Sequence, residues 1–488
     1  MSIPATQAKV NPVGFKQKLL KNIFVAGGYN YLSQILVFLS SMVTSRLLSP
    51  ESFGMVGLIT AFTGFILVFS DGGLSYALIR SEYGRPFHRV VTNLSWILGL
   101  TLFGITAAIA WPIAKFYNNP QLFAPTIVLG ITFLLRSISL TPGAVLAKEL
   151  NFNYIGKVTL ISNVSGALMT IILAFLDFGF WSLVFPQIVI AGVMAWMYER
   201  KVKLGFHIYS AKRVRFAFKY TSSLLGSILG FNAINYWARN TDNLVVGKVY
   251  GPSDLGIYNR AYSLMTLPVV IISGVFSNVL FPSLKDLKAN NGDTESTYYF
   301  VLKLISFITL PLVIAFVLFP QPIILFLWGN DWIKVAELLP YFGLLILAQN
   351  LLSTIGPVLV LEGAEKKFFV MGCVNAVFLV GAILYGATIS ITAIAQFYTL
   401  SYLLLAIPFT IVYAYIGTMK YHVKNTLIFW IPRILISLFV WIAIYFNSMM
   451  YQVIGLAVLV AYLLFEGRNE LGKAKALIQN RRIGKSKK

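Results

Sequence analysis

The sequence predicts an all-α polytopic membrane protein made of two parallel six-helix repeats followed by two further helices. Of its 488 residues, 58% are hydrophobic and only 11% are charged, whereas soluble domains carry about 25% charged residues. Apolar runs of about 20 residues, the length that spans the bilayer core, recur from one end of the chain to the other. They lack the strict alternation of a transmembrane β-barrel. One short motif also recurs at a fixed spacing, which indicates an internal repeat.

About fourteen of the apolar runs are long enough to cross a membrane. The polar, basic residues 1–21 lack the short apolar core and cleavage site of a signal peptide, so we expect the first span to be retained. The expected spans cover residues 22–47, 53–79, 90–114, 122–146, 155–176, 180–198, 221–248, 256–282, 298–319, 336–360, 368–388, 391–416, 425–446 and 450–466. Several contain Pro or Gly, which membrane helices tolerate where neighbouring groups satisfy the freed backbone.

The repeat is carried by a motif that joins one apolar run to the next. Leu48–Val56 (LSPESFGMV) matches Tyr250–Tyr258 (YGPSDLGIY) 202 residues later, and the same offset places Arg46 on Lys248. Six spans separate equivalent positions, so the two halves enter the membrane from the same side, as in a two-lobed transporter with a site between the lobes. The predicted domains are an N-terminal segment (1–21), an N-lobe (22–198), a basic linker (199–220), a C-lobe (221–416), two extra spans (417–466) and a basic tail (467–488).

The distribution of Lys and Arg predicts the orientation of the chain. If both termini share one side, that side receives 31 of the 39 basic residues, a bias that is typical of the cytoplasmic face. The formal net charge of +22 is therefore explained by topology and by contact with anionic membrane lipids, and nucleic-acid binding is not expected. The outer connections are too short for a folded domain. We expect both termini in the cytoplasm.

Ionisable residues within the spans are candidate functional residues, because each costs on the order of 3 kcal/mol in the bilayer centre. Arg239 and Asp242 lie three residues apart on one helical face, so they either pair with each other or line a water-filled cavity. Arg136 has no acid nearby in sequence, so it lines a cavity or pairs with Asp71 or another acid. Arg260 either reaches the outer interface or faces a cavity.

The remaining charged residues fit simpler roles. Arg46 and Lys248 mark the outer ends of equivalent spans, and Arg433 lies outside the repeat, where a structural or lipid-headgroup role is favoured.

The surplus of Arg over Asp indicates an anionic cargo, and Arg suits phosphate because its planar fork donates two hydrogen bonds. The substrate-binding candidates are Arg239, Arg136, Arg260, Arg46 and Lys248; the ion-coupling or charge-pair candidates are Asp242 and Asp71.

The sequence shows no signature of an enzyme. It has no nucleotide-binding P-loop, no Gly-x-Ser-x-Gly elbow and no metal-ligand spacing of His. Its single cysteine, Cys373, excludes an intrachain disulfide. We expect neither a metal nor a cofactor. The expected energy source is an ion gradient, with H⁺ or Na⁺ as the coupling ion, or the cargo itself. The aromatic residues Tyr29, Tyr31, Tyr236 and Trp237 either stack on sugar rings or pack against other helices.

The run from Asn240 to Gly247, the motif Gly251–Tyr258 and its first-half counterpart Ser45–Gly54 resemble the polysaccharide transporter family. This is the Wzx-like branch of the multidrug/oligosaccharidyl-lipid/polysaccharide exporter superfamily, near the colanic-acid and teichuronic-acid exporters. The resemblance implies a MATE-like fold in a bacterial inner membrane. It also implies translocation of an undecaprenyl-diphosphate-linked oligosaccharide from the inner to the outer leaflet. A polysaccharide polymerase and export machinery are the partners that it suggests.

Four alternatives remain at this stage. A cation-coupled multidrug antiporter of the same superfamily would need essential carboxylates, for which Asp71 and Asp242 are available. A lipid II flippase shares the fourteen-span layout and uses its last two spans as a groove for the lipid tail. A membrane enzyme that polymerises or transfers glycans would need a sizeable outer loop, and a scaffold without transport would leave the intramembrane Arg residues unexplained.

Overall fold

The computed structural model describes residues 12–71, 73–205, 207, 209–222, 225–290 and 292–485, and in parts of α1, α9, α10 and α19 it describes the backbone alone. These ranges contain helices and connecting turns, with no β-strand. The helices are α1 (Pro12–Leu47), α2 (Pro50–Val68), α3 (Leu74–Arg80), α4 (Arg85–Phe116), η1 (Pro120–Leu122), α5 (Phe123–Lys148), α6 (Phe152–Phe175), α7 (Trp181–Val202), α8 (Ala211–Ser222), α9 (Leu225–Val249), α10 (Gly251–Ala289), α11 (Thr294–Leu318), α12 (Pro320–Leu327), η2 (Asn330–Trp332), α13 (Val335–Ser353), α14 (Ile355–Leu361), α15 (Glu365–Ala387), α16 (Ile391–Ser401), η3 (Tyr402–Ala406), α17 (Ile407–Thr410), η4 (Ile411–Ile416), α18 (Val423–Tyr445) and α19 (Met449–Lys485). The predicted all-α membrane fold is confirmed.

Within the described residues, 12 helical segments are long and apolar enough to cross a membrane. They coincide with twelve of the predicted spans. The other two, 22–47 and 221–248, fall on α1 and α9, which lie partly outside the residues whose side chains are described. The count of fourteen spans therefore stays a prediction.

The predicted continuous span 53–79 is wrong, because the chain breaks into α2 and α3. The helix stops at Val68, and α3 starts at Leu74 after Gly73, which has a φ of +68°. The carboxylate of Asp71 accepts a hydrogen bond from the hydroxyl of Ser75, and its backbone oxygen accepts one from the Leu74 N–H at 2.9 Å. A Ser-Asp-Gly-Gly sequence favours such a turn over a helix, although the apolar residues on both sides make the run look continuous.

Both copies of the repeated motif begin a long helix directly after the end of another. Ser49 caps α2 by accepting the N–H of Ser52 at 3.4 Å, with Pro50 in the first turn. In the second copy α10 starts at Gly251, which has a φ of +84°, and Pro252 occupies the first turn. Proline fits there because a first-turn N–H has no partner within the helix. The sequence repeat is therefore a repeat of a helix–turn–helix corner.

Contacts divide the chain into two compact units, residues 1–255 and 256–488. The boundary falls in α10 just past the second corner, so α9 packs with the first unit in this structure. The predicted domains follow the repeat in the sequence, and their boundaries stay a prediction.

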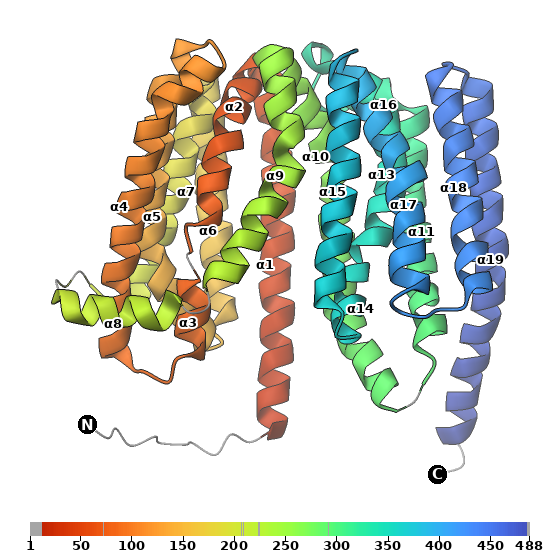
Figure 1. Cartoon of the computed structure of the whole chain (residues 1–488), viewed down its shortest axis with the longest axis horizontal. Coiled ribbons are helices and arrows are strands. Elements are labelled where there is room, and N and C mark those ends of the chain that lie inside the picture. Colours follow the sequence, from red (N-terminus) through yellow and green to blue (C-terminus); the bar gives the residue numbers. More distant parts are fainter. Residues whose placement is uncertain are drawn as a thin grey trace. The chain divides into compact units, whose positions relative to one another are not determined.

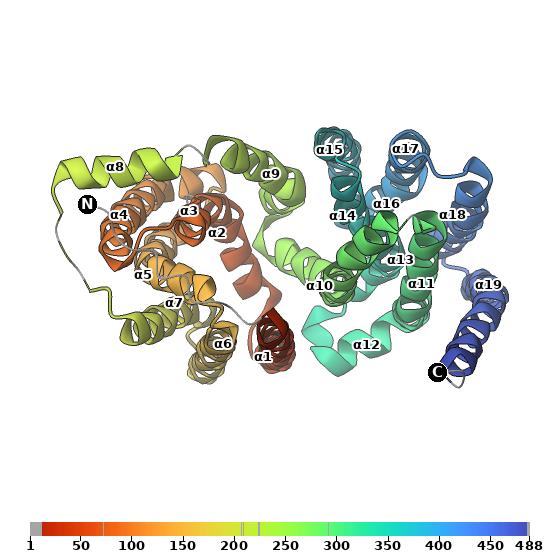
Figure 2. The same ribbon diagram turned by 90° about the horizontal axis from the view of Figure 1, so that it is seen from below.

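In the first unit, α5 packs between α4 and α7, α6 packs on α1 and α7, and α9 packs on α2. Small residues permit these close approaches, as is common between membrane helices. A Cβ on Gly99 of α4 would lie 2.5 Å from the side chain of Ser137 on α5. The helix α8 differs from the others because it runs across the end of α4, on which it packs (Figure 1; Figure 2).

In the second unit, α11 packs on α13 and α19, α15 on α16, and α18 on α19. A group of buried tyrosines joins α11 to the end of η4: the hydroxyl of Tyr298 bonds that of Thr354 at 2.9 Å and that of Tyr415 at 3.5 Å. The ring of Tyr415 also packs edge-on against Trp430 of α18. Hydroxyl pairing satisfies these polar groups inside the bundle.

Candidate functional site

The contact between α2 and α9 gathers the candidate residues of the central motif. The hydroxyl of Tyr236 on α9 donates to two backbone oxygens of α2, Thr60 at 3.1 Å and Ala61 at 2.8 Å. Gly64 makes room for it, since a Cβ there would lie 2.5 Å from the Tyr236 oxygen. Glycine on α2 is therefore what allows a tyrosine on α9 to reach the backbone of its neighbour.

Aromatic rings fill the rest of this contact. Trp237 lies 5.1 Å from the ring of Phe65 and 6.0 Å from the ring of Phe62, measured between centroids. Phe62 in turn meets Tyr117, at the end of α4, edge-on at 6.0 Å. Two roles were suggested for Tyr236 and Trp237, stacking on sugar rings and packing against other helices. The structure shows packing between helices. The described neighbours are aromatic side chains and, for Tyr236, the backbone of α2.

The two copies of the repeated corner meet at the end of the α2–α9 contact. A Cβ on Gly54, in the first copy, would lie 1.6 Å from the backbone oxygen of Pro252 in the second. A Cβ on Gly247, just before the second copy, would lie 2.4 Å from the side chain of Leu58. Any larger residue at Gly54 would have to push backbone apart, so Gly54 and Gly247 both serve close approach.

Arg239 and Asp242 occupy different environments although they share α9. Arg239 is exposed, while Asp242 is 3% exposed. One carboxylate oxygen of Asp242 accepts the backbone N–H of Asn243 at 2.8 Å. Helix α9 thus carries a buried carboxylate and an exposed guanidinium three residues apart.

Lys248 and Arg46 mark equivalent helix ends, as the repeat predicts. Each lies in the last turn of its helix, α9 and α1 respectively. The amine of Lys248 donates to the backbone oxygen of Phe116 and lies 4.8 Å from the centroid of that ring. Because Phe116 ends α4, Lys248 neutralises a free helix C-terminus.

Arg136 and Asp71 also belong to the first unit. Arg136 is exposed on α5 and makes no ion pair within the part of the chain that the structure describes. Asp71 is half-buried at the break between α2 and α3, where it accepts from Ser75. The structure therefore supplies local hydrogen bonding for Asp71, while the guanidinium of Arg136 remains available to an anion.

In the second unit, Arg260 lies among aromatic rings. Its guanidinium carbon is 5.3 Å from the ring centroid of Trp328 and 5.5 Å from that of Trp332. These distances are those of cation–π contacts. Sequence reasoning missed the two tryptophans, which are about 70 residues away in the chain; the two Trp residues in one short connecting segment were the available signal.

Arg433 is 2% exposed and lies in a network that holds α18 to α19 and α11. It pairs with Glu466 at 2.5 Å and donates to the backbone oxygen of Phe429 at 2.6 Å. It also contacts the hydroxyls of Tyr462 and Ser306, both at 3.4 Å. This network favours the structural role over the lipid-headgroup role for Arg433.

Comparison with known proteins decides the family. Residues 43–337, more than half of the chain, match the family described as polysaccharide biosynthesis protein. The chain belongs to this family. The resemblance suggested by the repeated motif is thereby confirmed, and the matched range includes both copies of the corner.

Proteins similar to this chain come from several bacteria. The teichuronic acid biosynthesis protein TuaB of Bacillus subtilis is 26% identical over 63% of this chain, and the match spans 64% of TuaB. The succinoglycan biosynthesis transport protein ExoT of Rhizobium meliloti is 25% identical over 74% of this chain and 73% of its own. The lipopolysaccharide biosynthesis protein WzxC of Escherichia coli is 23% identical over 70% of each chain.

Solved structures show the same fold. The lipid II flippase MurJ in an inward closed conformation superposes with a TM-score of 0.69 over 92% of this chain and all of its own, at 15% identity. An inward-facing multidrug MATE transporter gives a TM-score of 0.62 over 79% of this chain and 94% of its own, at 17% identity. The predicted MATE-like architecture is therefore confirmed, and the protein is a multi-pass membrane protein.

Proposed function

We propose that this protein is a flippase that moves an undecaprenyl-diphosphate-linked oligosaccharide from the inner to the outer leaflet during surface polysaccharide biosynthesis. The observation that carries the proposal is the membership of the polysaccharide biosynthesis family in a chain with the fold of a lipid flippase. The relatives are named for the biosynthesis of three different polysaccharides, and one of them is named a transport protein. This favours a shared transport step over synthesis, so we do not propose an enzyme.

Charge supports an anionic cargo. Arg239 on α9 and Arg136 on α5 are exposed, and an arginine in a membrane helix is stable only where it meets water, protein or an anion. A guanidinium binds a phosphate oxygen pair through two parallel hydrogen bonds. We therefore assign the diphosphate to these two arginines.

Arg260, Arg46 and Lys248 fit other roles better than binding of the cargo. Lys248 already holds the end of α4, and Arg260 already meets two tryptophans. They remain secondary candidates for binding the cargo. Asp242 and Asp71 are the candidates for a coupling ion, H⁺ or Na⁺, and Asp242 suits this role better because its carboxylate is buried.

Alternating access gives the α2–α9 contact a part in the cycle. In such a mechanism the two repeats rock about a central site, and these two helices belong to different repeats. The contact consists of ring edges, glycines and one tyrosine hydroxyl, whose carbonyl partners are already bonded within α2. Separation of α2 from α9 leaves few buried polar groups unsatisfied, so this contact is suited to open and close. From the basic connections we infer that the Gly54–Pro252 corner faces the outer side and that both termini lie in the cytoplasm.

A complementation assay tests the function. A deletion strain receives Arg136→Ala, Arg239→Ala or Asp242→Asn, and both surface polysaccharide and lipid-linked precursor are measured. We expect each Arg variant to insert at normal levels, to lose about 90% or more of surface polysaccharide, and to accumulate precursor, since a lost charged hydrogen bond costs roughly 1.5–3 kcal/mol. Lys115→Ala is the matched control, because Lys115 is an exposed cation stacked on Trp111 at 5.1 Å.

The opposite results would redirect the assignment. Failure of Asp242→Asn alone, with Arg variants active, favours the cation-coupled multidrug antiporter. Restoration of a strain that lacks its lipid II flippase favours the lipid II alternative. Normal surface polysaccharide in a deletion strain without a second copy overturns the flippase proposal. We also propose that the protein works with a polysaccharide polymerase and with export machinery as its partners.

A further inference from the structure

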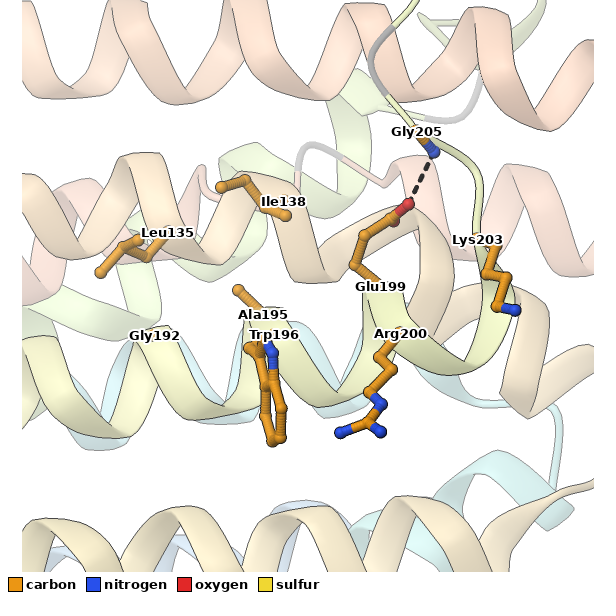
Figure 3. Close-up of a pocket in the computed structure, with 9 residues that line it drawn as sticks. All are labelled: Leu135, Ile138, Gly192, Ala195, Trp196, Glu199, Arg200, Lys203 and Gly205. Carbon is orange, nitrogen blue, oxygen red and sulfur yellow. Dashed lines mark hydrogen bonds between the residues drawn. The ribbon is translucent and has the colours of Figure 1, made fainter.

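A pocket of about 600 Å³ lies between α5 and α7, at the end of α7 from which the basic linker departs. Its apolar side is formed by Leu135 and Ile138 of α5 and by Gly192 and Ala195 of α7. One turn further along α7 the lining becomes Trp196, Glu199 and Arg200, and it ends at Lys203 and Gly205 (Figure 3). The pocket thus changes from apolar to cationic along the helix axis.

The polar end of the pocket is held in place by the chain itself. The backbone of Lys203 turns with a φ of +54°, and its N–H bonds the Glu199 backbone oxygen at 2.7 Å. The carboxylate of Glu199 accepts the N–H of Gly205 at 2.6 Å (Figure 3). The carboxylate of Glu199 is turned to the loop backbone, while Arg200 and Lys203 are exposed. Together the two cations and this one carboxylate leave the pocket mouth with a net positive charge.

Trp196 and Arg200 form one composite surface. The guanidinium carbon of Arg200 lies 5.2 Å from the ring centroid of Trp196, and Trp196 is 59% exposed. Stacking orients the guanidinium while its N–H edge remains available to an oxyanion. Tryptophan prefers the level of the lipid headgroups, so the ring indicates the depth of the pocket in the bilayer.

The helix α8 independently marks the same level. It lies across α4 rather than parallel to it (Figure 1), and Ala217 and Thr221 are buried. Phe216 and Phe218 are 53% and 54% exposed. Its exposed cations are Lys212, Arg213, Arg215 and Lys219. Apolar rings beside basic groups are typical of a helix that lies in a membrane interface next to anionic lipid.

We propose that the pocket between α5 and α7 binds the phosphate headgroup of an anionic phospholipid. Arg200 and Lys203 hold the phosphate, Trp196 packs on the glycerol region, and an acyl chain follows the apolar wall toward Gly192. A neutral or zwitterionic headgroup gains less, because the pocket offers two exposed cations at its mouth. This site is separate from the assignment of the oligosaccharide-diphosphate to Arg136 and Arg239, and its test does not depend on transport.

Native mass spectrometry of the purified full chain tests the site. The protein is incubated with equal amounts of phosphatidylglycerol and phosphatidylcholine, and the bound lipids are counted. We expect one retained phosphatidylglycerol in the wild type, with its affinity weakened roughly fivefold by Arg200→Gln or by Lys203→Gln, and more by both. Lys201→Gln is the matched control: it removes the same charge between the two positions, but Lys201 lies over the ring of Tyr154 at 5.6 Å and does not line the pocket.

A second variant tests the shape of the pocket without changing its charge. A Cβ on Gly192 would have its nearest neighbour at 3.9 Å, the side chain of Leu135, so Gly192→Leu fills the apolar wall without a backbone clash. We expect it to abolish the retained phosphatidylglycerol, and to abolish the rise in unfolding temperature that this lipid gives the wild type. Gly192→Ala should retain both.

Three outcomes overturn the proposal. The first is an equal loss of lipid in Lys201→Gln and Arg200→Gln, which would indicate a diffuse charge effect. The second is equal retention of phosphatidylcholine. The third is displacement of the phosphatidylglycerol by undecaprenyl phosphate at equal concentration with the same dependence on Arg200, which would make the pocket a substrate site.

Discussion

The α2–α9 contact of the first unit and the Arg433 network of the second unit hold helices together in opposite ways. In the first, glycines and ring edges bring two helices close, and a single neutral hydroxyl crosses between them. In the second, a buried guanidinium is paired with Glu466 and bonded to side chains and backbone of three helices. Separating the first exposes mainly apolar surface, whereas separating the second would strand a buried charge. Under the proposed function, the first contact is therefore better suited to open and close than the second.

The largest effect is expected from Arg433→Met. The substitution leaves the carboxylate of Glu466, whose side chain is 11% exposed, without its main partner. Breaking one side of a buried pair costs about 3–5 kcal/mol. Thermal unfolding in detergent should show a large loss of stability, and the double variant Arg433→Met/Glu466→Gln should recover part of it. A single variant as stable as the wild type would show that the network contributes nothing.

Gly54→Ala should have the next largest effect, on the equilibrium between closed and open forms of the α2–α9 contact. The added Cβ would lie 1.6 Å from the Pro252 oxygen, and overpacking of this kind costs roughly 1–3 kcal/mol. Maleimide labelling of Ala61→Cys, 2% exposed in this structure, should become faster when measured in a Cys373→Ser background. Gly104→Ala is the matched control, since a Cβ there meets nothing within 4 Å. Equal labelling in both variants would contradict the close-approach role.

Tyr236→Phe should have a smaller effect in the same labelling assay. It removes one donor, and the oxygens of Thr60 and Ala61 are not left stranded because they lie within helix α2. A hydrogen bond of this kind contributes about 0.5–1.5 kcal/mol, so labelling should rise less than in Gly54→Ala. An effect as large as that of Gly54→Ala would mean that the hydroxyl, and not the close approach, holds the contact.

The smallest effect is expected at His422, an exposed residue before α18. Its ring nitrogen lies 2.8 Å from the carboxylate of Glu295, and this hydrogen bond and charge raise the pKa of His422 above its ordinary value. A raised pKa in the folded state means that the stabilisation is fully present below about pH 6.5 and is lost as the pH rises through the folded-state pKa. His422→Asn should therefore lower the unfolding temperature slightly at about pH 5.5, and should match the wild type at about pH 9. A difference that persists at high pH would contradict a charge-dependent contact.

The sequence by itself determined the class of the protein, the places of the spans and the repeated corner. Hydropathy over about 20 residues is a local property, and a membrane leaves almost no choice but a helix for such a run. The motif at Pro50 and Pro252 is equally local, because first-turn prolines and the turn before them act within a few residues. The same reasoning missed the break at Asp71, since apolar residues on both sides dominated a short turn signal.

Only the tertiary structure decided what each charged side chain meets. Arg239 and Asp242 are three residues apart, which separates them by about 60° around the helix, enough for one to be exposed and the other buried. Lys248, Arg260 and Arg433 take their partners from other elements of the chain. Spacing along one helix sets which side chains are neighbours on that helix, but the environment of each is set by the helix that packs against it.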